Sequence, residues 1–259
     1  MKLTPFSPKT ASNLFLSGAI IGPVVDSLHN QCLLKYNFLP ISLYLPSELE
    51  HTTPFFCSSW AVPPLLGFAY VVLGGILPRL FQSFLKETND NDLNVISQDQ
   101  SVSLRTKAVL AVTTTAVIIK ISEVLETNTI LSLDPTTKIL VLLTLCLSQW
   151  AWLDGTFAAL IAASITSIGG PLSELPFVAQ NVWNYLPSAA DYFPLQNLSS
   201  DSSSLTLITS SLTWVLGDDY QQLALSSITG PCYFAVTMDA IAIGRWLDHE
   251  NSNKDSTYK

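Results

Sequence analysis

The sequence has little charge. Only 12% of its 259 residues are Asp, Glu, Lys or Arg, whereas 48% are hydrophobic. Soluble domains carry roughly 25% charged residues, about twice this share. The scarcity of charge excludes an ordinary soluble domain. Several uncharged runs approach the roughly 20 residues that a helix needs to cross a bilayer, so the sequence indicates a polytopic membrane protein. The length suits one bundle better than two domains.

Basic residues are scarce as well, with 12 Lys and Arg against 20 Asp and Glu. They form no basic run, and the acids gather in the predicted loops. The net charge of -8 therefore gives no indication of nucleic-acid or membrane-surface binding. There are only four cysteines, and their spacing is not that of a metal site. Cys32 and Cys57 flank one loop and are either a disulfide or two free thiols.

Catalytic motifs are missing. The chain has no G-x-S-x-G, no H-E-x-x-H and no phosphate-binding loop. Its three histidines, His29, His51 and His249, lie in separate segments, and none is adjacent to a cysteine. We therefore expect a protein that is not an enzyme, with no catalytic residue, no cofactor and no metal site.

Six apolar stretches predict an all-α, six-transmembrane-helix bundle. Pro135 suits the first turn of the fourth helix, with Asp134 as its N-cap. The pair Gly169 and Gly170, followed by Pro171, is expected to end the fifth helix. The expected helices lie at about 14–25, 58–81, 106–125, 136–153, 155–172 and 229–247. The expected division of the chain is a cytosolic N-terminus (1–13), a membrane domain (14–247) with a lumenal insertion (173–225), and a cytosolic polar tail (248–259).

The distribution of Lys and Arg predicts the orientation. Six spans place both termini on one side of the membrane, and that side carries nine basic residues against two on the other. Basic residues favour the cytosol, so both termini are predicted to be cytosolic. The insertion is then lumenal, and it contains the chain's only glycosylation sequon, at Asn197. The terminal side holds Lys2, Lys9, Arg79, Lys86, Arg105, Lys107, Arg245, Lys254 and Lys259; the other side holds Lys35 and Lys138.

The second helix contains two consecutive prolines, Pro63 and Pro64. Either they bend or widen the helix and leave room for a ligand, with Ser58 and Ser59 capping the freed backbone groups, or they only begin the helix. Farther along, Gly67 offers a small surface on which another helix can pack closely.

Ionisable residues fall within or beside several predicted helices. Asp26 and His29 are three residues apart and share one helix face; they are either a buried polar site, such as a proton relay or a cavity lid, or a helix end that reaches the head groups. Asp239 lies midway along the sixth helix, where the cost of a charge in lipid predicts that it faces the bundle interior. Glu123 is placed to neutralise Lys120 inside the third helix.

Three stretches together resemble one protein family. They are Ser58-Ser-Trp-Ala-Val-Pro-Pro64; Leu131-Ser-Leu followed by a helix ending in Gln149-Trp-Ala-Trp-Leu-Asp154; and Pro231-Cys-Tyr-Phe with Ile243-Gly-Arg245. Their order and spacing are similar to those of the insulin-induced gene (INSIG) family of six-helix endoplasmic-reticulum membrane proteins. The resemblance covers most of 14–247, without the 173–225 insertion.

The resemblance implies a membrane-embedded regulator. Such a protein would bind a sterol or a diacylglycerol-like lipid, and would retain or control partner membrane proteins of lipid synthesis, including a sterol-sensing one, in cholesterol metabolism. Asp154 would contact the partner at the cytosolic end of the fourth helix. The lipid would occupy a cavity lined by helices two to five, and the expected lipid-binding residues are Pro63, Pro64, Gly67, Thr137 and Trp150.

The chain also departs from the family pattern. Gly155 and Thr156 follow the aspartate where the family has Arg and Ser, and Thr137 replaces a polar amide. These departures concern the partner and the lipid more than the fold. The alternative function is a small transporter or channel that uses Asp26, His29, Glu123 and Asp239. Because the first 25 residues lack acids, a plastid or other organellar membrane is the alternative location.

Overall fold

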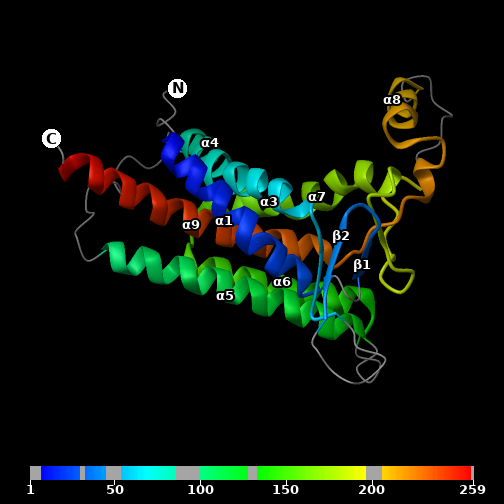
Figure 1. Cartoon of the computed structure of the whole chain (residues 1–259), viewed down its shortest axis with the longest axis horizontal. Helices are drawn as coiled ribbons and strands as arrows, with labels where there is room; N and C mark the ends of the chain where they lie inside the picture. Colours follow the sequence, from blue (N-terminus) through cyan, green and yellow to red (C-terminus); the bar gives the residue numbers. More distant parts are fainter. Residues whose placement is uncertain are drawn as a thin grey trace.

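Six long helices lie side by side in the computed structural model, which describes residues 7–29, 33–44, 54–85, 100–127, 133–196 and 206–257 (Figure 1). Each helix overlaps one of the six that the sequence predicts. They are α1 (Pro8–Ser27), the continuous helix α3–η1–α4 (Val62–Tyr70, Val71–Ile76 and Leu77–Leu85), α5 (Gln100–Thr127), α6 (Pro135–Leu153), α7 (Phe157–Ala179) and α9 (Thr229–Thr257).

The two ends of the bundle differ in structure. The start of α1 and the end of α9 lie at one end, which we call the terminal end, and the short strands lie at the other, which we call the strand end (Figure 1). Successive long helices run in alternating directions between the two ends. Both ends of the chain that the structure describes therefore lie on the same side, as six antiparallel helices require.

Four of these helices are long and apolar enough to cross a membrane. Judged by length and composition, the candidate spans are Val62–Leu85, Ser103–Thr127, Pro135–Leu153 and Phe157–Ala179. A helix of 19 residues or more, at 1.5 Å per residue, covers nearly the whole ~30 Å hydrocarbon core. The chain is thus a mostly helical, multi-pass membrane protein.

The helix starts follow from local chemistry. Asp134 caps α6 by accepting hydrogen bonds from the Thr137 backbone N–H (3.0 Å) and hydroxyl (2.6 Å), with a proline in the first turn, as predicted. The N-cap of α7 is Thr156, whose hydroxyl accepts from the Ala159 N–H at 3.3 Å. The preceding Asp154 is the C-cap of α6.

The prolines of the second helix lie in its first turn. The helix begins at Val62, so Pro63 and Pro64 occupy positions whose N–H groups have no partner within a helix. Of the two interpretations of the sequence, the one in which the prolines only begin the helix is therefore correct. The helix widens about two turns farther on, in the π-helical stretch η1.

Two predicted helix ends were wrong, and one of them is that of the sixth helix, α9, which continues past 247 to Thr257. The fifth long helix, α7, continues past Gly169, Gly170 and Pro171 to Ala179, so residues 173–179 belong to the helix and not to the insertion. Gly170 lies against Tyr233 of α9 so closely that a Cβ atom there would overlap the ring. Burial of this face against α9 outweighs the low helix propensity of glycine and proline.

The strand end corrects the all-α expectation. Here β1 (Leu34–Tyr36) pairs antiparallel with β4 (Trp183–Tyr185), and β2 (Pro40–Leu43) pairs antiparallel with β3 (Phe56–Ser59). Leu34 and Tyr36 of β1 are buried while the residue between them is exposed, which is the alternation of a strand packed on one face. The insertion also adds α8 (Thr206–Leu216), which is too short to span a membrane and packs Leu212 and Leu216 against the core.

Helix α9 is the centre of the bundle and contacts α1, η1, α5, α6 and α7. It crosses η1 at two glycines, Gly74 and Gly244. A Cβ atom at Gly244 would overlap the carbonyl oxygen of Gly74, and one at Gly74 would overlap that of Ala240. The two backbones touch here, so this crossing tolerates no side chain, which is how helices approach closely in membranes.

We expect Gly244→Ala to destabilise the protein by about 1–3 kcal/mol, because the added methyl group forces α9 away from η1. Gly169→Ala is the matched control, since no atom lies within 4 Å of its Cβ position and alanine favours a helix by roughly 0.5–1 kcal/mol. The thermal midpoint in mild detergent should fall for Gly244→Ala and rise or stay unchanged for Gly169→Ala. Equal midpoints for the two variants would contradict the close crossing.

Candidate functional site

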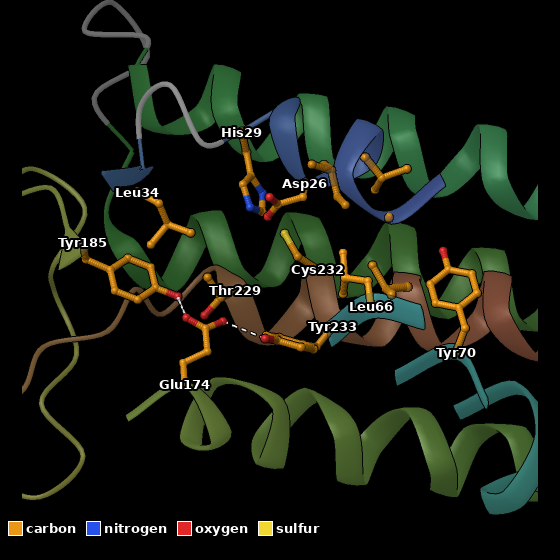
Figure 2. Close-up of a pocket in the computed structure, with 14 residues that line it drawn as sticks. Asp26, His29, Leu34, Leu66, Tyr70, Glu174, Tyr185, Thr229, Cys232 and Tyr233 are labelled. Carbon is orange, nitrogen blue, oxygen red and sulfur yellow. Dashed lines mark hydrogen bonds between the residues drawn. The ribbon is translucent and has the colours of Figure 1, made fainter. Parts of the chain in front are cut away.

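A cavity of about 80 Å³ lies inside the bundle near the strand end. Side chains of α1, α3, α5, α7 and α9 line it, together with β1 and β4 (Figure 2). A buried water needs roughly 10–15 Å³, so this volume holds several waters or a small chemical group. The apolar lining comes from Gly22, Val25, Leu34, Leu66, Ile119 and Val236, and the polar lining from Asp26, His29, Tyr70, Glu174, Tyr185, Thr229, Cys232 and Tyr233.

Glu174 of α7 is the most heavily bonded polar residue of the cavity. Its side chain accepts hydrogen bonds from the hydroxyls of Tyr185 and Tyr233, each at 2.7 Å, and from the Trp183 indole N–H at 3.3 Å. Figure 2 shows the two tyrosines approaching it from opposite sides. Because the donors belong to β4 and α9, this one carboxyl group connects three segments of the chain.

Asp26 of α1 faces the same cavity. It accepts a hydrogen bond from the Tyr36 hydroxyl at 2.6 Å and a longer one from Ser58 at 3.4 Å. The buried imidazole of His29 lies next to it (Figure 2). The structure therefore brings Asp26 and His29 together at a cavity, and their role there stays a prediction.

The environment shifts the pKa values of three groups at the strand end. Burial lowers the pKa of His29 to about 4, so its imidazole is neutral at pH 7. Burial also raises the pKa of Tyr36 well above its ordinary value, and the nearby Asp26 adds to the rise. The pKa of Tyr185 is raised by burial and by Glu174. Both tyrosines therefore stay protonated and act as hydrogen-bond donors at neutral pH.

Asp239 lies deeper in the bundle and is fully buried, as predicted. The hydroxyls of Tyr70 and Thr115 lie near enough to interact with its carboxyl group, but neither carboxyl oxygen has a hydrogen bond of normal geometry within the described part of the chain. The Tyr70 hydroxyl, also fully buried, likewise has none. Since Tyr70 lines the cavity, Asp239 lies just behind its wall.

The expected lipid-binding residues lie elsewhere. Thr137 belongs to the cap of α6, and Trp150 donates its indole N–H to the Thr156 carbonyl at 2.9 Å near the terminal end. Gly67, Pro63 and Pro64 all belong to α3, where the two prolines lie in the first turn. Gly67 packs against the Phe15 ring of α1. None of the five lines the described cavity, which includes α1 and α9 and leaves out α6. Their proposed lipid contacts stay predictions.

Asp154, the expected partner residue, is held inside the protein. Its carboxylate forms an ion pair with Arg245 of α9 at 2.5 Å and accepts hydrogen bonds from the Thr156 backbone N–H (3.0 Å) and hydroxyl. Its side chain is only 5% exposed. The neighbouring residues of the α6–α7 turn, Trp152 and Phe157, are 66% and 70% exposed. Asp154 therefore fixes the turn that presents these two rings.

The residues proposed for transport do not form one path. Glu123 is paired with Lys120 on α5, as predicted, and lies outside the cavity lining. Within the described residues, no group of three His, Cys, Asp or Glu side chains is placed to hold a metal. Asn197 and Cys32 lie outside the described residues. Glycosylation of Asn197 and a disulfide between Cys32 and Cys57 therefore stay predictions.

Three residues that dominate the cavity are not predicted from the sequence: Glu174, Tyr185 and Tyr233. Glu174 lies beyond the predicted end of the fifth helix, in the predicted insertion. The sequence does carry one signal, an acidic residue within the mostly apolar stretch 171–182, three residues beyond the proline expected to end the helix. The partners Tyr185 and Tyr233 could be identified only once β4 and α9 were placed beside α7.

His29 gives a test of burial at the site. The unfolded chain binds a proton at His29 below pH 6.5, whereas the folded protein resists it until about pH 4. The stabilisation is therefore complete above pH 6.5 and is lost as the pH falls, by about 2 kcal/mol between pH 7 and pH 5. We expect the thermal midpoint of His29→Phe to fall less over this range than that of the wild type. Identical slopes for His29→Phe and the wild type would show that His29 is not buried.

Comparisons with known proteins show what the chain resembles. A family model described as Insulin-induced protein (INSIG) matches residues 10–248. No curated protein matches the chain. Two crystal structures of MvINS, an Insig homolog from Mycobacterium vanbaalenii, share its fold with a TM-score of 0.55 each. One, a cross-linked trimer, is 14% identical and aligns over 94% of this chain and 96% of its own; the other is 15% identical and aligns over 93% and 95%.

Proposed function

The chain belongs to the insulin-induced protein (INSIG) family of membrane regulators of lipid synthesis, and from this premise we propose that it binds a membrane lipid with its head group in the strand-end cavity and in that state controls a partner membrane protein. The family is regulatory and non-enzymatic, and its members bind sterols and sterol-sensing membrane proteins. The lipid of this chain would be of the sterol or diacylglycerol class.

The observation that carries the lipid proposal is the composition of the cavity. Apolar side chains and a cluster of hydrogen-bonding groups line the same space, which is the combination that an amphipathic molecule requires. At about 80 Å³ the cavity has room for a head group, so the acyl chains or sterol rings would extend between the helices. A solute without an apolar part would leave the apolar walls unused.

We further propose that all six long helices span the membrane, so that 14–247 is one membrane domain. The support is packing: α9 lies among the four most apolar helices and α1 beside them, so neither is placed to leave the bilayer. The distribution of basic residues supports cytosolic termini, and the family resemblance supports the endoplasmic reticulum.

An endoglycosidase-sensitive glycan that is lost in Asn197→Gln would confirm a lumenal insertion; its absence would count against this orientation.

Partner binding is proposed at the terminal end. There the ion pair between Asp154 and Arg245 holds the α6–α7 turn, which exposes Trp152 and Phe157. Because the Asp154 carboxylate is itself buried, we propose that it acts by positioning this turn and that the exposed rings touch the partner.

Lipid extraction tests the cavity proposal. We expect the wild-type protein, purified in mild detergent, to retain one lipid class that mass spectrometry of the extract identifies. Val236→Phe should lose it, because the larger ring fills space inside the cavity. Val112→Phe is the matched control, since Val112 packs against one of the same clusters as Val236 but does not line the cavity. Loss from Trp150→Ala alone would instead place the lipid beside α6.

Substitutions at the ion pair test the partner proposal. We expect Asp154→Ala and Arg245→Ala to weaken co-purification of the partner equally, because either change frees the same turn. Each should also lower the thermal midpoint, since breaking a largely buried ion pair costs about 3–5 kcal/mol, less here because Arg245 is partly exposed. Loss of the partner from Asp154→Ala with full retention in Arg245→Ala would mean that the carboxylate contacts the partner directly.

A further inference from the structure

The β2–β3 hairpin at the strand end carries large apolar side chains that the described part of the chain leaves uncovered. The Trp60 N–H donates to the Leu39 carbonyl at 3.1 Å, and at the other end of the ladder the Phe55 N–H donates to the Leu43 carbonyl at 3.0 Å. Apolar groups gathered on a surface in this way mark a site that binds a protein or a membrane. We call the exposed set the hairpin patch; its members are between 48% and 67% exposed and are Phe38, Leu39, Leu43, Tyr44, Phe55 and Trp60.

The described part of the hairpin has no charge. Residues 36–44 and 54–78 contain no Asp, Glu, Lys or Arg. The connection between the two strands holds Glu48 and Glu50, and it lies outside the described residues. The insertion differs, because it exposes three acids, Asp191, Asp218 and Asp219. The strand end therefore has an apolar part and an acidic part, and only the acidic part is suited to bulk water.

The hairpin patch continues the lipid-facing surface of the second long helix. The candidate span begins at Val62, two residues after Trp60. Farther along this span Phe68, Val72 and Ile76 are exposed, and on a membrane-spanning helix such side chains face lipid. Trp and Tyr are enriched at the level where a span meets the head groups. The place of Trp60 in the chain puts the patch at this level.

The backbone of the hairpin limits how deep the patch can lie. Within the described residues β2 and β3 form a sheet of two strands, so each strand has one edge without a strand partner. Such edges do not occur in the hydrocarbon core, where no water replaces the missing hydrogen bonds. Each strand has four residues, fewer than the roughly 9–11 that a spanning strand needs. The side chains favour leaving bulk water and the backbone needs some water, and the head-group layer satisfies both.

We infer that the hairpin patch is a membrane-binding surface that lies in the head-group layer of the bilayer at the strand end. Its partner is the lipid surface and not a second protein, because the patch is uncharged and continuous with side chains that face lipid. This surface requires a bilayer but no lipid in the cavity, so it goes beyond the proposed function and does not depend on it. Ser58 of β3 donates to Asp26, which lines the cavity, so the hairpin also places the cavity at the depth of the head groups.

Photocrosslinking from single positions tests this surface. The photoreactive residue p-benzoylphenylalanine replaces Phe55, the full chain is irradiated in phosphatidylcholine liposomes, and mass spectrometry measures the lipid and protein adducts. We expect lipid adducts at Phe55 in a yield similar to that at Phe68, which faces lipid on the candidate span. Phe193 is the matched control, since it is exposed in the acidic insertion, and its lipid yield should be several-fold lower.

A second measurement needs no photoreactive residue. Phosphatidylcholine brominated in the upper part of its acyl chains quenches the fluorescence of a tryptophan that it contacts. The quenched fraction should therefore be smaller in Trp60→Phe than in the wild type. Because the Trp60 side chain is exposed, its replacement by another aromatic ring leaves the packing of the bundle unchanged.

Three results would overturn the membrane-binding surface. They are a lipid yield at Phe55 as low as that at Phe193, adducts at Phe55 with a second copy of the chain in place of lipid, and an unchanged quenched fraction in Trp60→Phe. None of them bears on the lipid of the cavity, which extraction tests separately. Failure of this surface and failure of the proposed function are thus distinguishable.

Discussion

The buried carboxyl group of Glu174 is the constraint on which the strand end depends. A buried, unpaired polar group of this kind costs several kcal/mol, so its hydrogen-bond partners must be present in the folded protein. They are Trp183 and Tyr185 of β4 and Tyr233 of α9. Satisfying one side chain of α7 thus brings together three segments separated in sequence. The wall of the cavity is a consequence of this requirement.

Helix α9 connects the two ends of the molecule. It contributes Tyr233 and Val236 to the cavity, touches the η1 backbone at Gly244, and supplies Arg245 to the ion pair with Asp154. Arg79 forms a further ion pair with Asp248 near the same end. The terminal end is therefore held by charges, whereas the strand end keeps a cavity. One helix therefore contributes residues to both proposed sites, the lipid cavity and the turn proposed to bind the partner.

Much of the fold could be predicted from the sequence, because the bilayer imposes long apolar segments that composition reveals. All six helices, the cap of α6, the Lys120–Glu123 pair and the burial of Asp239 follow from local patterns. The site could not be predicted in the same way. Asp26 and His29 were identified by their spacing on one helix, but Glu174 acquires its role from partners on other segments. The continuation of α7 through Pro171 likewise depends on Tyr233, which no local pattern of α7 reveals.

Photolabelling tests the location of the lipid most directly. A diacylglycerol and a sterol, each carrying a diazirine, would be irradiated with the wild-type protein in lipid nanodiscs, and the labelled peptides mapped by mass spectrometry. The account predicts labels within 22–29, 174–185 and 229–236, the segments of α1, α7–β4 and α9 that line the cavity. Labels confined to 137–150 of α6, with none on α9, would contradict it and would place the lipid beside Thr137 and Trp150, two of the residues that the family resemblance implies.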